Sequence, residues 1–134
     1  MSSTLTAAAA FPASLTTLDS GLTVIHQRTS ATPVASVDVW VKAGAALEPD
    51  EWCGMAHFLE HMIFKGTEQI PPGVFDQEVE FRGGVTNAAT SYDYAHYFIT
   101  TAVQYLDETL PFLAEILLNA AIPDDEFDRE RDVV

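Results

Sequence analysis

Residues 54–67 read GMAHFLEHMIFKGT, and this stretch determines both a local structure and a possible chemistry. Residues 55–64 contain neither Pro nor Gly and lie between two glycines, which predicts a helix of about three turns. Successive helical residues are rotated by about 100°, so His57, Glu60 and His61 share one side of this helix. The stretch therefore predicts two imidazoles and one carboxylate gathered on a single helix face.

Two imidazoles one helical turn apart can bind a single metal ion at about 2.0–2.1 Å each. A nearby carboxylate that does not bind the metal can take a proton from a metal-bound water molecule. We interpret His57 and His61 as metal ligands and Glu60 as the base of a metal-assisted hydrolysis. The alternative is two ordinary helix histidines with a carboxylate beside them by accident, but this pentapeptide should arise by chance in well under about 1% of chains of this length.

The N-terminal part of the chain predicts strands. Residues 1–14 are small, polar or alanine-rich without periodicity, and predict a loose segment. The turn residues at 18–22 lie between two apolar runs and lead into a strand at 22–27, which predicts a β-hairpin. Residues 35–41 are apolar at every second position and predict a strand with one buried face.

After the motif helix, Pro71 and Pro72 predict the start of a second helix that runs to residue 81 and ends at Gly83-Gly84. Residues 85–90 and 94–101 are rich in Thr, Tyr and Ile and predict a second hairpin.

Apolar residues at helical spacing predict a third helix, and Pro111 requires it to begin near Asp107, where the first amides have no intrahelical partner. A further helix is predicted over residues 124–134. The order of elements predicts one α+β domain over residues 15–134, with a mostly antiparallel sheet and helices packed on one face.

Composition narrows the classes of partner. The chain has 134 residues, 48% of them hydrophobic, and a net charge of −14 from 6 basic and 20 acidic residues. This charge opposes binding to nucleic acid or an anionic membrane surface. No stretch has the roughly 18 consecutive apolar residues of a membrane helix, and no signal peptide is seen, so we expect a cytoplasmic location. The acidic segment 107–132 fits a solvated helix face or a surface for basic substrates.

Three separated motifs resemble the signature of the pitrilysin, insulinase and mitochondrial processing peptidase family, peptidase family M16. The first is the stretch 54–67 with its H-x-x-E-H motif, which is typical of inverzincins. The second is GGVTNAATSYD at 83–93, and the third is FDRERDVV at 127–134. The resemblance runs from about Leu15 to the end of the chain and implies an incomplete N-terminal M16 catalytic domain.

The resemblance implies a Zn²⁺-dependent endopeptidase that hydrolyses peptides or unfolded polypeptides. It makes His57 and His61 zinc ligands, Glu60 the general base, and Glu130 a carboxylate outside the ligand set. In the family the third ligand is a glutamate seven residues after the last of these, which would be position 137, beyond Val134. We therefore expect the chain by itself to be inactive.

The resemblance also predicts how substrate binds. Asn87, Ala88, Ala89 and Thr90 resemble the exposed strand with which these enzymes pair an extended peptide through main-chain hydrogen bonds. The alternative is an ordinary sheet strand. In the family two homologous halves, each built from two such units, enclose the substrate. The expected partners are therefore the peptide and the remainder of the assembly or a homologous half.

Two alternatives to a peptidase remain open. One is a non-catalytic M16-like subunit or peptide-binding module, although such relatives usually lose part of the H-x-x-E-H set. The other is the S-ribosylhomocysteine lyase family, whose third ligand is a downstream cysteine, but none follows Cys53. We interpret Cys53 as incidental and the strand histidines His26 and His96 as structural.

Overall fold

The chain divides at Pro33 into two units. The structure is a computed structural model that describes residues 12–133. Each unit is described by itself, and the motif helix belongs to the second. The predicted single domain over residues 15–134 stays a prediction.

The first unit contains a two-stranded hairpin. β1 (Ala13–Thr17) pairs antiparallel with β2 (Thr23–Gln27), as predicted. The strand β1 begins earlier than expected, because Ser14 pairs with His26 and its hydroxyl donates to the His26 carbonyl oxygen at 3.3 Å. Residues 13 and 14 of the segment predicted to be loose are thus strand, and residues 1–11 lie outside the described residues.

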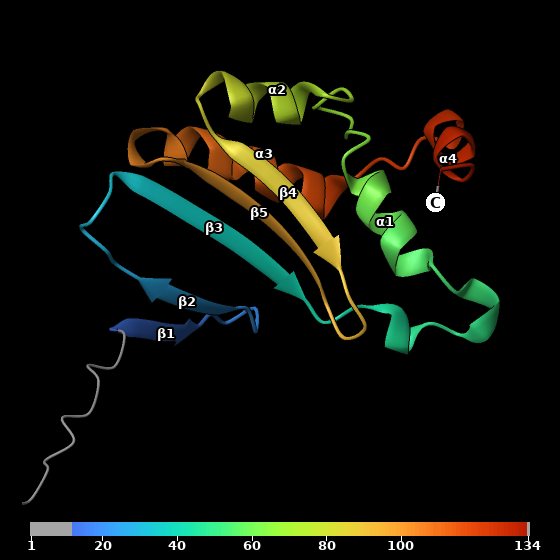
Figure 1. The fold of residues 1–134 in the computed structure, drawn as a ribbon, viewed down its shortest axis with the longest axis horizontal. Coiled ribbons are helices and arrows are strands. Elements are labelled where there is room, and N and C mark those ends of the chain that lie inside the picture. The colour runs from blue at the N-terminus through green and yellow to red at the C-terminus, as the bar shows by residue number, and fades with distance from the viewer. Residues whose placement is uncertain (1–11, 134) are drawn as a thin grey trace, which may run out of the picture. The chain divides into compact units, whose positions relative to one another are not determined.

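The second unit is built on a three-stranded antiparallel sheet (Figure 1). Its strands are β3 (Val34–Val41), β4 (Val85–Thr90) and β5 (Ala95–Ala102), in the order β3-β5-β4. The predicted strands at 35–41, 85–90 and 94–101 are therefore confirmed to within a residue or so. Because β5 is central, one edge of β4 has no strand partner among the described residues.

Among the described residues of this unit, four α-helices and three short 3-10 turns accompany the sheet. The α-helices are α1 (Met55–Ile63), α2 (Val74–Phe81), α3 (Leu106–Asn119) and α4 (Asp124–Glu130). The 3-10 turns are η1 (Ala45–Leu47), η2 (Asp50–Trp52) and η3 (Val103–Tyr105). In the part of the chain that the structure describes, no helix has the length and apolar character needed to cross a membrane.

The core lies between the sheet and the helices. Helix α3 contacts β5, helices α1 and α2 contact β4, and α4 contacts α1 (Figure 1). Alternate residues of β5 are buried on the helix side, so Ile99 and Tyr97 pack with residues of α2 and α3 such as Val79 and Leu113. Full burial of an aliphatic side chain contributes roughly 1.5–3 kcal/mol. The α+β class, with a mostly antiparallel sheet and helices packed on one face, is confirmed.

Helix α2 begins later than the sequence predicts. Pro71 and Pro72 precede the helix instead of opening it, because Gly73 has φ of +79°, outside the helical region. The first helical residue is therefore Val74. Gly83 follows the helix with φ of +69°, so glycine ends α2 as predicted.

The predicted start of α3 near Asp107 is confirmed to within one residue, but Pro111 lies beyond the first free amides, and α4 ends earlier than expected. α3 begins at Leu106, which makes Pro111 its sixth residue, so the Asp107 carbonyl lacks its usual helical donor. α4 ends at Glu130, after which the Val133 N–H bonds to the Glu130 carbonyl oxygen at 2.9 Å in a turn. The predicted extension of this helix is therefore wrong for residues 131–133. Val134 lies outside the described residues.

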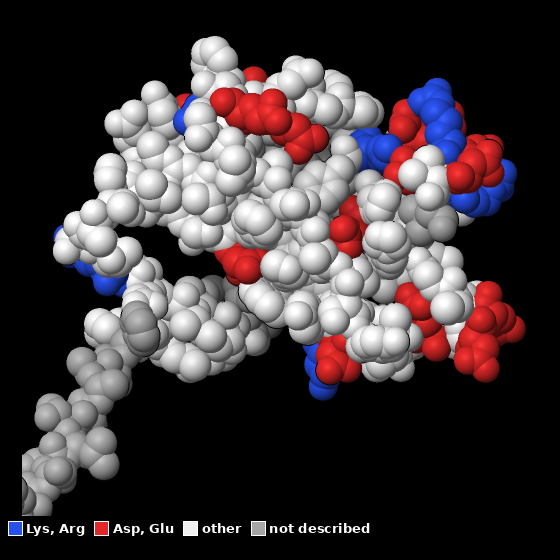
Figure 2. All heavy atoms as spheres, viewed as in Figure 1, with Lys and Arg blue, Asp and Glu red and all other residues white. Residues whose placement is uncertain are grey.

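Three acidic side chains of α4, those of Asp124, Asp125 and Asp128, are exposed, and this end of the second unit also carries basic side chains (Figure 2). Asp125 pairs with Arg129 at 3.2 Å, and Asp128 pairs with Arg131 at 3.2 Å. Pairs of this kind on a helix surface contribute little to stability. The exposed carboxylates of Asp125 and Asp128 are thus paired with basic neighbours, as on a solvated helix face.

Candidate metal centre

A carboxylate from the preceding loop fixes the start of α1. Gly54, the residue before the helix, has no side chain to cap it. Glu48 supplies the cap: it accepts from the Gly54 N–H at 2.8 Å and from the Ala56 N–H at 2.5 Å. A negative group at this position satisfies free amides and interacts favourably with the helix dipole.

The same loop is bound to the turn between β4 and β5. The Ala45 N–H donates to the Ser91 carbonyl oxygen at 3.1 Å, and the Ala46 N–H donates to that of Tyr92 at 2.9 Å. Gly44 allows this approach, because a Cβ there would lie 2.4 Å from the Ser91 oxygen. The loop thus holds the first turn of α1 near the end of β4.

His57 and His61 are brought together on α1. Their Nε2 atoms are 3.2 Å apart, and the two rings meet edge to face. Two nitrogens bound at about 2.0–2.1 Å to a tetrahedral ion lie about 3.3–3.4 Å apart. The pair therefore fits two corners of a zinc site with little adjustment.

Glu130 of α4 contacts the other nitrogen of His61. Its Oε1 lies 2.6 Å from Nδ1, and the carboxylate is buried, with 8% of its surface exposed. A carboxylate accepts, so the ring carries its proton on Nδ1 and its Nε2 lone pair faces His57. The resemblance implies that Glu130 lies outside the ligand set, and in the structure it contacts the His61 nitrogen that does not face His57.

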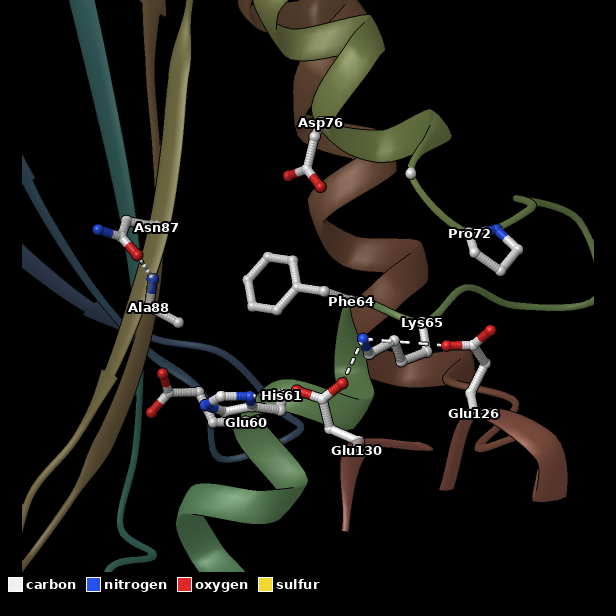
Figure 3. A pocket seen from close by; sticks show the side chains of 11 residues that line it. Glu60, His61, Phe64, Lys65, Pro72, Asp76, Asn87, Ala88, Glu126 and Glu130 are labelled. Atoms are coloured by element: carbon white, nitrogen blue, oxygen red, sulfur yellow. Dashed lines mark hydrogen bonds and ion pairs between the residues drawn. The ribbon is translucent and has the colours of Figure 1, made fainter. Parts of the chain in front are cut away.

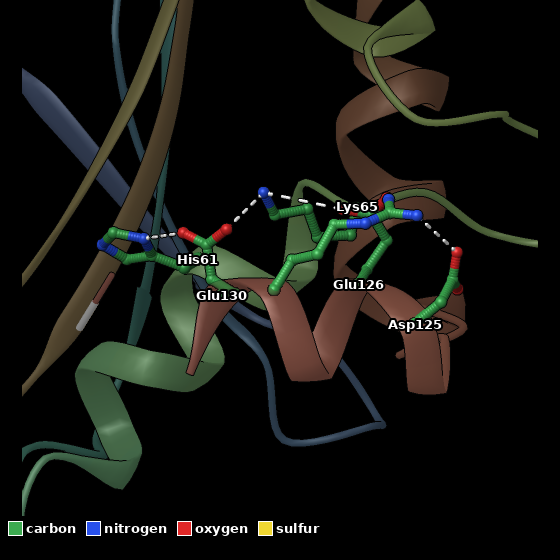
Figure 4. A network of polar contacts seen from close by, with 6 residues as sticks. His61, Lys65, Asp125, Glu126 and Glu130 are labelled. Carbon is green, nitrogen blue, oxygen red and sulfur yellow. Dashed lines mark hydrogen bonds and ion pairs between the residues drawn. The ribbon is translucent and has the colours of Figure 1, made fainter. Parts of the chain in front are cut away.

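Lys65 completes this contact. Its Nζ lies 2.5 Å from Oε2 of Glu130 and 3.9 Å from Glu126 (Figure 4). The hydrogen bonds from Lys65 and then His61 lower the pKa of Glu130 below its ordinary value, although burial acts in the opposite direction. Glu130 is therefore held as a carboxylate between α1 and α4.

Glu60 points toward β4. Its Oε2 accepts a short hydrogen bond from the Thr90 hydroxyl. Tyr97 lies nearby on the buried face of β5, where burial and then the charge of Glu60 raise its pKa to about 12. The Tyr97 hydroxyl is thus neutral at physiological pH.

The site opens into a cavity of about 450 Å³ (Figure 3). Glu60 and His61 of α1 line it together with Phe64, the residue after this helix, and Asn87 and Ala88 line it from β4. Asp76 points into it from α2, and its pKa is raised by burial and then by the charge of Glu80. The cavity is thus lined jointly by the motif helix and the edge strand β4.

The predicted substrate strand forms the edge of the sheet. Asn87, Ala88, Ala89 and Thr90 all lie in β4, whose outer edge has no strand partner in residues 12–133. The Asn87 side-chain oxygen accepts from the Ala88 N–H at 2.9 Å. A peptide that used this amide would have to displace the Asn87 side chain.

Other candidate residues lie outside this arrangement. His96 of β5 bonds to Asp38 of β3 at 3.0 Å and stacks on Trp40, as expected for a structural histidine. Cys53 is exposed and lines a separate hollow with Phe58. His26 lies in the first unit, in β2.

The described residues bring together two candidate metal ligands, His57 and His61. No cluster of three or more His, Cys, Asp or Glu side chains that could hold a metal occurs in residues 12–133. Glu126 of α4 does not join the two histidines, because its carboxylate pairs with Lys65 and Arg129. Two histidines are one protein ligand fewer than a catalytic zinc site normally has.

Sequence reasoning missed three contacts: Glu48 with the start of α1, Lys65 with Glu130, and Thr90 with Glu60. Each joins residues of different elements. Of the three, only the contact of Glu48 could have been predicted from local sequence, because Glu48 lies a few residues before the helix start.

Comparison with known proteins gives consistent matches. Residues 23–134 match the model of the family described as Insulinase (Peptidase family M16). The chain is 40% identical over 120 residues to a probable mitochondrial-processing peptidase subunit beta of Arabidopsis thaliana, covering 90% of this chain and 23% of that protein. It is 42% identical over 119 residues to the zinc protease PqqE of Helicobacter pylori, covering 88% and 27%.

Two further matches concern the fold and the range of the family. A crystal structure of a protease from Helicobacter pylori superimposes with a TM-score of 0.86 at 39% identity, over 90% of this chain and 29% of that one. Cytochrome b-c1 complex subunit 1 of Bos taurus is 34% identical over 117 residues, covering 87% and 24%. The chain thus spans about a quarter of the length of the relatives it matches.

Proposed function

The chain belongs to the insulinase family, peptidase family M16, and on that premise we propose that it carries part of the active site of a zinc-dependent metalloendopeptidase. The substrates would be peptides or unfolded polypeptides. The observation that supports this most is the pair of facing Nε2 atoms of His57 and His61, 3.2 Å apart, with Glu60 on the same helix.

His57 and His61 would hold the metal through Nε2, and Glu130 keeps the Nε2 lone pair of His61 available. Zinc, when bound, supplies Lewis-acid polarisation of a peptide carbonyl and acidifies water. Glu60 would accept the proton of the attacking water and later deliver it to the leaving amine. The main chain of residues 87–90 would orient the peptide along the edge of β4.

The third zinc ligand would come from outside residues 12–133, where only two are found together. The family resemblance puts it at position 137. An isolated chain 1–134 would then be inactive. The relatives named as subunits support the proposal that the chain works with the remainder of an M16 assembly or with a homologous half.

A second candidate is a non-catalytic subunit. It is favoured by the 34% identity to a protein named for the cytochrome b-c1 complex instead of for peptide hydrolysis. The presence of His57, Glu60 and His61 with their supporting contacts favours the peptidase.

The proposal is tested with Glu60→Gln in the intact protein. This change keeps the side-chain shape and removes the base, so kcat should fall by at least about 10²-fold while zinc content stays the same. Glu68→Gln is the matched control, because Glu68 is exposed and lies just after α1. Peptide hydrolysis and metal content are measured for both variants.

Two results would contradict the assignment. Full turnover in Glu60→Gln would mean that Glu60 is not the base. Parallel loss of zinc and activity would make Glu60 a ligand.

A further inference from the structure

Thr90 is the last residue of β4, and its side chain makes a contact that a main-chain substrate strand does not need. Alternate residues of β4 differ in burial, and Thr86, Ala88 and Thr90 are the more buried set, on the side of α1. Thr90 is therefore directed at the helix that carries the motif. Its hydroxyl donates to Oε2 of Glu60.

This hydrogen bond restricts a side chain that is otherwise free to rotate. A glutamate has three side-chain torsions and loses substantial rotamer freedom when it is ordered. With Oε2 occupied by Thr90, the other oxygen, Oε1, remains available to a water molecule. The orientation of that second oxygen is then set by the hydroxyl.

Thr90 itself is well held. The next residue, Ser91, donates its N–H to the Tyr94 carbonyl oxygen at 2.8 Å and accepts from the Ala45 N–H at 3.1 Å. Thr90 also pairs with Ala95 across the sheet. A donor mounted on a strand end that is fixed on two sides can hold its acceptor in one place.

We propose that Thr90 is a positioning residue that holds Glu60 in the orientation required of the general base. The inference rests on the proposed function, because it assigns a role relative to the base of that site. It predicts an effect on kcat with little effect on KM, since the main chain that would pair with a peptide is unchanged when only the hydroxyl is removed.

The kinetic test compares three variants of the intact protein. Thr90→Val removes the hydroxyl at nearly constant shape and should lower kcat by about tenfold or more, because small misplacements of catalytic groups are costly. Thr90→Ser keeps the hydroxyl and should restore most of kcat. Thr86→Val is the matched control: Thr86 lies on the same side of β4, but its hydroxyl donates to the Phe98 carbonyl oxygen at 3.0 Å.

A second readout does not depend on activity. In the metal-free protein with ¹³C-labelled glutamate, NMR couplings should show Glu60 in one rotamer in the wild type, in Thr86→Val and in Thr90→Ser. Thr90→Val should show rotamer averaging. Thr90→Ala serves as the hydroxyl-free variant if the valine variant does not fold.

The outcomes separate the two proposals. An ordered Glu60 and an unchanged kcat in Thr90→Val, with loss of turnover in Glu60→Gln, would overturn the role of Thr90 and leave the proposed function standing. Full turnover in Glu60→Gln would overturn the proposed function, whatever the rotamer of Glu60.

Discussion

At the scale of single residues, the ring of His61 is restrained through both of its nitrogens. Nδ1 meets Glu130 at 2.6 Å and Nε2 faces His57 at 3.2 Å. Glu130 is in turn bound by Lys65 from the end of the motif helix. A ligand histidine ordered in this way before the metal arrives loses less freedom on binding, and contacts of this kind tune metal affinity.

We predict that the chain binds zinc weakly at one site formed by His57 and His61. Residues 12–133 bring together only two of the usual three protein ligands, so affinity should be far below that of a complete site. Isothermal titration calorimetry with zinc should lose this site in His57→Ala and in His61→Ala. His96→Ala is the control, since His96 is a strand histidine bound to Asp38. Equal binding by the double variant His57→Ala/His61→Ala would refute the assignment.

The sequence could predict the parts of the site that lie within one helix. His57, Glu60 and His61 share a face because of helical periodicity alone. The contact of Thr90 with Glu60 spans 30 residues and that of Glu130 with His61 spans 69. Such contacts depend on how strands and helices pack, which local periodicity does not encode. The family resemblance predicted a role for the carboxylate of Glu130, but it predicted no role for the side chain of Thr90.

At the scale of elements, the placement of α1 depends on its N-terminal cap. Glu48 binds two amides of the first turn, and the loop that carries it is bonded to the β4–β5 turn. The cap therefore connects the start of the motif helix to the end of the strand that contacts Glu60.

We predict that Glu48→Ala destabilises the protein by about 0.5–2 kcal/mol, the usual effect of removing a helix cap. The variant leaves the amides of Gly54 and Ala56 without their acceptor and should lower the melting temperature. Thermal unfolding followed by circular dichroism measures the change. Glu51→Ala is the control, because Glu51 is exposed in the same loop region. An equal loss of stability in the control would point to a general charge effect instead of the cap.

Strands and the motif helix were predictable because their patterns are simple. Residues 35–41 alternate and residues 85–90 are β-prone, and both form strands as expected. Helix limits were less predictable. Helix α2 starts later than predicted because Gly73 is not in a helical conformation. Helix α3 contains Pro111 in its interior, and its packing on β5 offsets the cost of the proline.

At the scale of the whole molecule, several large apolar side chains of the second unit are exposed. Phe81 at the end of α2 is 87% exposed, and Leu118 near the end of α3 is 80% exposed. Exposed apolar groups that gather into patches commonly mark surfaces that another unit covers. On the proposed function, further polypeptide would cover such side chains and supply the third ligand that residues 12–133 lack.

Our final prediction concerns reconstitution of the enzyme. Residues 1–134 alone should show no peptide hydrolysis, because residues 12–133 bring together only two of the three protein ligands that the proposed zinc site needs. Mixing them with a separately expressed polypeptide that carries the third ligand and the homologous half should restore activity and raise the melting temperature. His57→Ala/His61→Ala in the chain is the matched control, since it should associate and gain stability without activity. Full activity from residues 1–134 by themselves would show that neither the third ligand nor the second half is required, and would contradict the proposal that this chain is one part of a composite active site.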